Sequence, residues 1–204
     1  MTSDVEELQQ LVLHERQGRD RGRWDQMAAA FAPGARVRIS WLDGTAEQFV
    51  AGSRLMAASG TTAAHRMGAV IVDLVGQRAL IEAPAVIELR TLLGGVEVDL
   101  SSRVRLVYRA ERKRSGWPDG AWLLESLDCI YESDSVSPVV PGEIPDVDAA
   151  ALARLRPAYR WLAYVLDSAK HFVDQGMPGE DEPEAVAALY DAARVWLHEE
   201  RVGV

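Results

Sequence analysis

The sequence predicts an α+β fold, in which N-terminal helices cover the concave face of a curved antiparallel sheet and more helices follow the sheet. Three observations predict this fold. Apolar residues recur at helical spacing near the N-terminus, long extended segments follow one another from residue 62 to 133, and prolines then precede two further helical patterns. We therefore expect an α+β domain at residues 1–136, and a proline-rich connector with a helical extension at residues 137–204.

The first helix begins with a capping box formed by Ser3 and Glu6. Its apolar stripe consists of Val5, Leu8, Leu11 and Val12. Continued at helical spacing, the stripe reaches Glu15, Gly18 and Arg19 instead of more aliphatic residues. The helix therefore either emerges into water at this end or begins to line a cavity. A second short helix is predicted from Trp24 to Phe31, and Ala32-Pro33-Gly34 ends it.

The hydrophobic period then changes to that of strands. Val37, Ile39 and Trp41 alternate with polar residues, and Asp43-Gly44 predicts a tight turn. A short helix is expected at 50–59. The extended segments that follow are 63–75, 78–93, 96–110 and 121–133.

The C-terminal part begins with Pro138, Pro141 and Pro145, which predict a stiff connector. One helical pattern covers residues 147–173 with a kink at Pro157, and another begins at Pro183. Two amphipathic helices cannot form a core alone, so we expect them to pack on the sheet or on a partner subunit. A homodimer through these helices or the convex face of the sheet is expected.

Composition and charge narrow the function classes. The chain has 204 residues and a formal net charge of -9, and so lacks the basic footprint needed to bind nucleic acid. No apolar run approaches the roughly 18 residues of a membrane span, and the N-terminus lacks the pattern of a signal peptide. The single cysteine, Cys129, excludes an internal disulfide framework. We expect a cytoplasmic protein with neither nucleic-acid nor membrane partners.

Particular residues, together with the order of the elements, resemble the SnoaL-like branch of the NTF2-like superfamily. The resemblance covers about residues 4–134. The residues that carry it are Asp20-Arg21-Gly22-Arg23-Trp24-Asp25, Ala32-Pro33-Gly34-Ala35, Thr61-Thr62-Ala63-Ala64-His65-Arg66-Met67-Gly68 and the segment from Gly116 to Trp122. The resemblance implies a cone-shaped α+β barrel, a fold that hosts enzymes such as polyketide cyclases and dehydratases and also pure binding modules.

The resemblance also implies a catalytic pair. Dehydratase-like members place an aspartate at the position of Asp20 and a histidine at the position of His65, facing each other in the pocket. A carboxylate that fixes the imidazole tautomer lets the histidine remove a proton next to a carbonyl group. The residues alone also allow a structural role for each member of the pair. Asp20 is then an acid at a helix terminus, and His65 is a residue at the start of a strand that is hydrogen-bonded to the backbone.

Further pocket candidates depend on which face of each strand points inward. Trp41 ends an alternating strand, and Met67 shares a strand face with His65. Glu15 stands where several dehydratase-like members carry a tyrosine. Glu82 can be a second acid in the pocket only if its face of the 78–93 strand points inward, and otherwise its side chain is solvated. The same choice decides whether three other residues reach the substrate: Arg103, Arg105 and Asp128.

These features predict an enzyme that acts without a cofactor on a small apolar carbonyl or polyketide-like substrate. His65, oriented by Asp20, would catalyse cyclisation, isomerisation or dehydration by proton transfer. The second hypothesis is a non-catalytic ligand-binding or assembly module of the same superfamily. No metal is expected, because His14, His171 and His198 form no familiar ligand spacing with His65.

Overall fold

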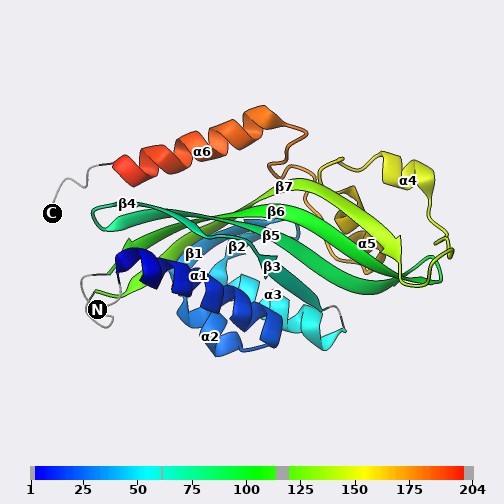
Figure 1. Cartoon of the computed structure of the whole chain (residues 1–204), viewed down its shortest axis with the longest axis horizontal. Coiled ribbons are helices and arrows are strands. Elements are labelled where there is room, and N and C mark those ends of the chain that lie inside the picture. The colour runs from blue at the N-terminus through cyan, green and yellow to red at the C-terminus, as the bar shows by residue number, and fades with distance from the viewer. Residues whose placement is uncertain (1–2, 61, 114–119, 200–204) are drawn as a thin grey trace.

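The computed structural model describes residues 3–60, 62–113 and 120–199, and it confirms the predicted α+β fold with a curved sheet (Figure 1). The described helices are α1 (Asp4–Arg21), α2 (Trp24–Ala29), α3 (Ala46–Ala58), α4 (Ala149–Ala153), α5 (Arg160–Ser168) and α6 (Pro183–His198). The described strands are β1 (Phe31–Ile39), β2 (Leu42–Thr45), β3 (Ala63–Met67), β4 (Ile71–Val75), β5 (Arg78–Leu93), β6 (Val96–Arg112) and β7 (Trp122–Pro138). Most of the segment Gly116–Trp122 lies outside the described residues.

All seven described strands belong to one sheet, in the order β2-β1-β7-β6-β5-β3, with β4 also pairing with β5. The long strands β5, β6 and β7 form the expected antiparallel meander. Strand β1 pairs with β7 in parallel, so the first strand joins the sheet beside the last. The sheet therefore curves around the chain's N-terminal helices.

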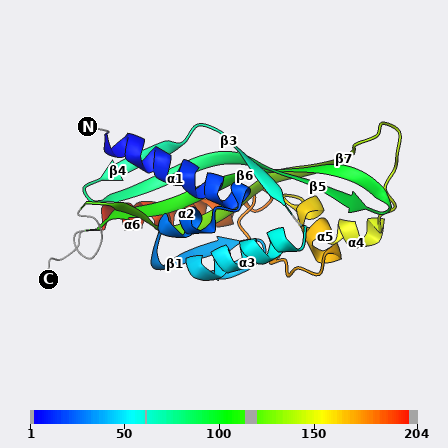
Figure 2. The ribbon, with the colours of Figure 1, turned by 90° about the horizontal axis from the view of Figure 1, so that it is seen from below.

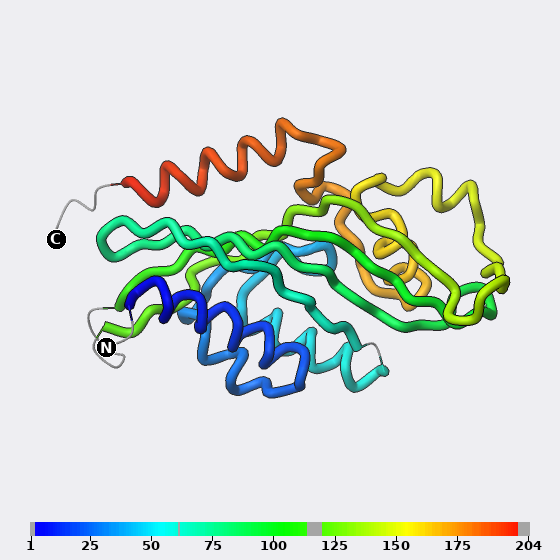
Figure 3. Tube along the Cα trace, viewed as in Figure 1, coloured from blue at the N-terminus to red at the C-terminus, as the bar shows by residue number. Residues whose placement is uncertain are grey.

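The helices divide between the two faces of the sheet. Seen from below, α1, α2, α3 and α5 lie in front of the sheet, and most of α6 lies behind it (Figure 2). The Cα trace shows α6 running along the opposite face (Figure 3). The main core fills the space between the concave face and the first helices, with buried Leu8, Met27 and Phe49 among its members. A smaller cluster joins Ala193 and Leu197 of α6 to the other face of the sheet.

The turn between α1 and α2 explains why the end of α1 is buried. The capping box of Ser3 and Glu6 begins α1, and Gly22, with φ 65°, ends it in the left-handed conformation that glycine adopts easily. A Cβ added at Gly18 would come within 2.8 Å of the backbone nitrogen of Met27, so glycine lets α1 and α2 approach closely. The last turn of α1 is thus held against the core.

Three predicted elements are corrected. The segment 63–75 is two strands, β3 and β4, separated at residues 68–70. The segment 147–173 contains two separate helices, α4 and α5, instead of one kinked helix. The helix expected at 50–59 begins earlier, at Ala46, because Thr45 and Gln48 form a capping box.

The C-terminal elements pack on the sheet. Strand β7 extends to Pro138, five residues beyond the predicted end of this extended segment at 133. The N-terminus of α5 is held by β7, where the Asp134 carboxylate accepts a hydrogen bond from the Leu162 backbone N–H at 2.8 Å. Among the described helices, none is both long and apolar enough to span a membrane.

Candidate active site

Asp20 and His65 meet at the end of α1 and the middle of β3. The ring Nδ1 of His65 lies 2.6 Å from Oδ1 of Asp20, and the backbone N–H of His65 donates to Oδ2 of the same carboxylate at 2.7 Å. Both side chains are largely buried, with exposed fractions of 8% and 17% for His65 and Asp20. Because an ionised carboxylate only accepts, Nδ1 carries the proton and Nε2 of the neutral ring is left as the basic atom.

A second buried group faces the other side of the His65 ring. Nη1 of Arg16 lies 3.4 Å from Nε2 of His65. The Nε and Nη2 atoms of Arg16 donate to the two oxygens of Glu15, and the hydroxyl of Tyr108 donates to Glu15 at 3.2 Å. Glu15 is fully buried, so its carboxylate is satisfied by side chains rather than by water. Of the guanidinium nitrogens of Arg16, Nη1 is the one directed toward the histidine.

The electrostatic environment keeps His65 neutral. Burial is the main reason that the pKa of His65 lies below its usual value, and the charges of Arg16 and Arg19 lower this pKa further. The hydrogen bond to Asp20 opposes the shift. Burial disfavours the ionised form of Asp20, but its hydrogen bonds with His65 hold the pKa of Asp20 below its usual value. At neutral pH the pair is therefore a carboxylate and a neutral imidazole.

A cavity opens in front of His65, and its wall is mostly apolar. It is bounded by α1, the end of β1, α3, the concave faces of β3, β5, β6 and β7, and α5. The lining residues beyond Arg16, Arg19 and His65 are Ile39, Ser40, Trp41, Phe49, Met56, Ala63, Ile87, Leu89, Leu106, Cys129, Tyr131, Leu162 and Leu166. Such a wall excludes water from the basic nitrogen and suits a small apolar molecule. Burial raises the pKa of the Cys129 thiol to about 12, so this cysteine is not a nucleophile near neutral pH.

Residues 1–128 match the SnoaL-like domain family. The chain belongs to this family. One SnoaL-like relative is Pea pathogenicity protein 2 from Fusarium vanettenii, which is 31% identical over 198 residues that cover 91% of this chain and 82% of the relative.

Solved structures show the same NTF2-like fold at lower identity. An NTF2-like family protein from Streptomyces avermitilis is 17% identical with a TM-score of 0.50, over 67% of this chain and 97% of that chain. The hexachlorocyclohexane dehydrochlorinase LinA-type3 from Novosphingobium barchaimii LL02 is 13% identical with a TM-score of 0.51, over 70% of this chain and 92% of that chain. These likenesses show that this SnoaL-like chain shares its fold with enzymes and with proteins of other descriptions.

The structure brings some of the predicted site residues together. Asp20 and His65 form the pair described above, Trp41 lines the cavity, and Glu15 lies behind it as the partner of Arg16. Met67 lies on the inward parity of β3 and packs against the core, but it does not line the cavity.

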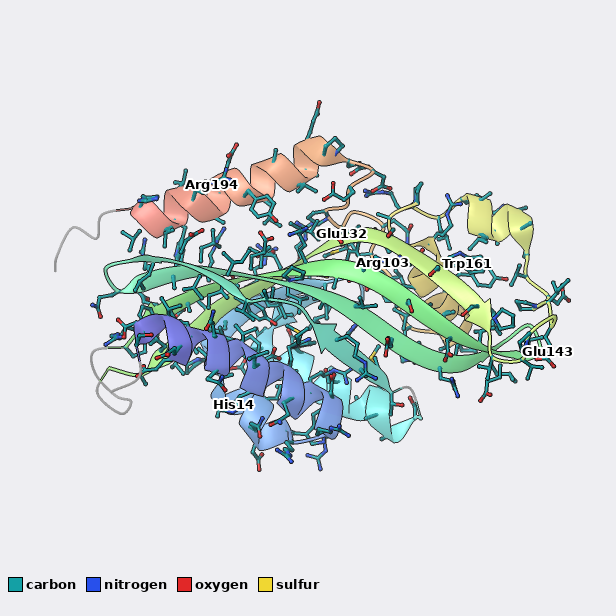
Figure 4. The ribbon with its side chains drawn as sticks, in the orientation of Figure 1. His14, Arg103, Glu132, Glu143, Trp161 and Arg194 are labelled. Carbon is teal, nitrogen blue, oxygen red and sulfur yellow. The ribbon has the colours of Figure 1, made fainter. Side chains whose placement is uncertain are left out.

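The structure places the other predicted residues on the opposite face of the sheet, which corrects the inward parity considered for them. Glu82 pairs with Arg105 at 2.5 Å and accepts a hydrogen bond from Tyr190 of α6 at 2.7 Å. Figure 4 shows Arg103 on β6, where its guanidinium is 3.4 Å from the hydroxyl of Ser133. Asp128 borders a separate groove under α6. The inward-facing residues of β5 are the apolar ones, because this face of the strand lies toward the N-terminal helices. The face that carries the charged residues lies on the other side of the sheet.

Sequence reasoning missed several residues of the site. The sequence patterns do not single out Arg16, although it follows Glu15 on the polar continuation of the α1 stripe. Tyr108 lies on the strand face opposite Arg103 and Arg105, which in the fold is the inner face, and its hydroxyl reaches Glu15 there. Leu162 and Leu166 come from α5, and only the three-dimensional packing places them at the cavity.

The structure offers no metal centre in the described part of the chain. Within residues 3–60, 62–113 and 120–199, no group of three or more His, Cys, Asp or Glu side chains is placed to hold a metal ion. His14 lies on the exposed outer side of α1, away from the cavity (Figure 4).

Proposed function

We propose that this protein is an acid/base enzyme that uses His65 to remove a proton from a carbon next to a carbonyl group of a small apolar substrate. The observation that carries the proposal is the double contact between Asp20 and His65, which fixes the ring by its Nδ1 and by its backbone N–H. The lowered pKa of His65 keeps Nε2 unprotonated at neutral pH, as a general base requires.

Arg16 supplies the complementary charge. Removing a proton next to a carbonyl group places negative charge on the carbonyl oxygen, and a guanidinium beside that oxygen stabilises it. The distance of 3.4 Å between Nη1 and Nε2 is longer than an ordinary hydrogen bond, so a substrate oxygen that replaces Nε2 as the partner of Nη1 displaces only a weak contact. Glu15 holds the guanidinium in place while leaving Nη1 directed toward the substrate.

The proton on Nε2 can then return to another atom of the same substrate. Return to a leaving hydroxyl gives dehydration, and return to a different carbon gives isomerisation. In cyclisation the carbanion attacks a second carbonyl carbon of the substrate, the C=O π bond opens, and the proton on Nε2 goes to the new alkoxide oxygen. All three outcomes use the same pair of residues, and the fold neighbours include a dehydrochlorinase, which performs an elimination by its name. The proposed steps require only the side chains described here.

The test uses proton exchange, which needs no knowledge of the natural product. The protein is incubated in D₂O with small ketones such as 1-indanone and 2-tetralone, and deuterium uptake next to the carbonyl is followed by mass spectrometry. We expect uptake above the buffer rate, and a loss of about 10²- to 10⁴-fold in His65→Gln. The control is His14→Gln, which should exchange as the wild type does. A wild-type rate in a folded His65→Gln variant would sink the proposal, and no exchange by the wild type with any ketone would favour the non-catalytic binding module.

A further inference from the structure

Arg19 is a second cation at the cavity, and the proton-transfer step described above does not use it. It lies in the last turn of α1, one turn after Arg16, and is 7% exposed. Its side chain lines the same cavity as His65, beside apolar residues of β1 and α3. A guanidinium this deeply buried has lost most of its contact with water.

Within the described residues, the guanidinium of Arg19 has neither a hydrogen-bond acceptor nor an ion-pair partner. The two nearby carboxylates are already engaged: Glu15 accepts from Arg16 and Tyr108, and both oxygens of Asp20 accept from His65. Two other buried or half-buried arginines are paired: Arg16 binds Glu15, and Arg156 contacts Asp181 at 2.6 Å. Arg19 thus lines the cavity with N–H donors for which the described residues provide no hydrogen-bond acceptor.

The charge of Arg19 persists at neutral pH. Burial is the main cause that lowers the pKa of Arg19, to about 10, and the neighbouring charge of Arg16 lowers it further. The charges of Asp20 and Glu15 oppose this shift, although both carboxylates are hydrogen-bonded to other groups. A buried charge without a hydrogen-bonded counter-ion is costly, so its retention at a cavity calls for a ligand that completes it. The planar fork of a guanidinium matches the two oxygens of a carboxylate better than any neutral acceptor.

We propose that Arg19 binds a carboxylate group of the substrate, so that the substrate class is a small, mainly apolar carboxylic acid. This inference rests on the proposed function for the identity of the ligand as substrate, but the carboxylate site itself does not depend on catalysis. The acid group lies at Arg19, the apolar body lies against Trp41 and the leucines of α5, and the reacting carbon faces His65.

The test compares benzoate with benzamide, which has nearly the same shape and no charge. Binding to the full chain is measured by calorimetry or by NMR titration. We expect benzoate to bind the wild type about 10- to 100-fold more tightly than benzamide, the range of a charge-assisted hydrogen bond. Arg19→Met should reduce this preference to less than about 3-fold, whereas Arg21→Met, an exposed residue of the same helix, should retain it.

Thermal unfolding separates a binding role from a structural one. Because Arg19 is unpaired, Arg19→Met should melt at or above the wild-type temperature. Equal affinity of the wild type for the two probes, or an undiminished benzoate preference in Arg19→Met, would overturn the proposal.

The His65→Gln variant distinguishes the two proposals. Benzoate binding that survives in this variant while ketone exchange is lost supports both. Exchange that survives in His65→Gln, with benzoate binding lost only in Arg19→Met, removes the catalytic proposal and leaves the carboxylate site.

Discussion

Replacing Asp20 by asparagine should reverse the tautomer of His65 while preserving its position. The carboxylate now accepts at 2.6 Å from Nδ1 and at 2.7 Å from the backbone N–H of the histidine. An asparagine can accept only one of these bonds through its amide oxygen. With the oxygen on the backbone N–H, the amide NH₂ faces Nδ1, so Nδ1 must accept and the ring proton moves to Nε2. The basic atom that faces the cavity is then lost.

The magnitudes follow from these contacts. Loss of one charge-assisted hydrogen bond in a largely buried site should lower the free energy of unfolding by about 1–3 kcal/mol. Loss of the positioned base should reduce ketone exchange by about 10²- to 10⁴-fold. The substitution therefore separates a modest effect on stability from a large effect on proton transfer.

The assay needs three measurements on the same samples. Long-range ¹H–¹⁵N NMR reports which ring nitrogen of His65 carries the proton, chemical denaturation gives the free energy of unfolding, and mass spectrometry gives the exchange rate. The control is Asp25→Asn, which changes an exposed acid at the start of α2 and should leave all three unchanged. An Asp20→Asn variant that keeps Nε2 unprotonated and exchanges at the wild-type rate would refute the orienting role of Asp20.

Three other predictions concern charge and pH. Glu15→Gln should lower the free energy of unfolding by about 3–5 kcal/mol in denaturant titrations, because it leaves Arg16 buried and unpaired. The control is Glu7→Gln at an exposed position, which should change this free energy by less than about 0.5 kcal/mol. A loss below about 1 kcal/mol for Glu15→Gln would contradict the buried pair. Burial raises the pKa of Asp134 from 3.8 to about 6, so its contribution to stability is present below pH 3.8 and is lost as pH rises through 6. The free energy of unfolding of Asp134→Asn, relative to that of the wild type, should therefore increase between pH 4 and 7. We expect an increase of about 1–2 kcal/mol, less than the full pKa shift implies, because the carboxyl is partly solvated. Parallel plots of unfolding free energy against pH for the two proteins would count against this role of Asp134. Because the pKa of His65 is lowered, exchange should lose activity only as pH falls below 6.5, and an inflection above 6.5 in the rate profile would be inconsistent with a buried neutral base.

The location of the pair could be predicted from the sequence because its signals are local or come from the family resemblance. The stripe on α1 changes from aliphatic residues to Glu15 and Arg19, which indicates a helix end that borders a cavity. Asp20 and His65 occupy positions that the SnoaL-like resemblance connects. The hydrogen bonds between them, and their burial, required the structure.

The strand faces could not be predicted, because alternation in a strand gives two faces without saying which is inner. In β5 the inner face is the uniformly apolar one, which leaves Glu82 on the side of α6. The break between β3 and β4 has a similar origin. Pro84 of β5 has no N–H to donate, and its carbonyl accepts instead from Gly68 at 2.7 Å, where the pairing changes from one strand to the next.

The contribution of α5 was hidden for a different reason. Its amphipathic pattern predicts a helix with a buried face, but periodicity does not say what that face covers. In the fold, Leu162 and Leu166 line the same cavity as His65. The wall that determines which ligand fits is therefore built partly by residues beyond the SnoaL-like match at 1–128.

Arg19 connects recognition with chemistry in the proposed complex. In the free protein, the charges of Arg16 and Arg19 both lower the pKa of His65, which keeps the ring neutral but also makes it a weaker base. A carboxylate bound at Arg19 neutralises one of these charges inside a site from which water is excluded, so the pKa of His65 rises when the substrate binds. The base is thus stronger when the acid group is in place, and a ketone without one is exchanged by the weaker base of the free protein. An uncharged analogue of the same shape would lose this increase as well as the contact with Arg19, so its kcat should fall along with its affinity.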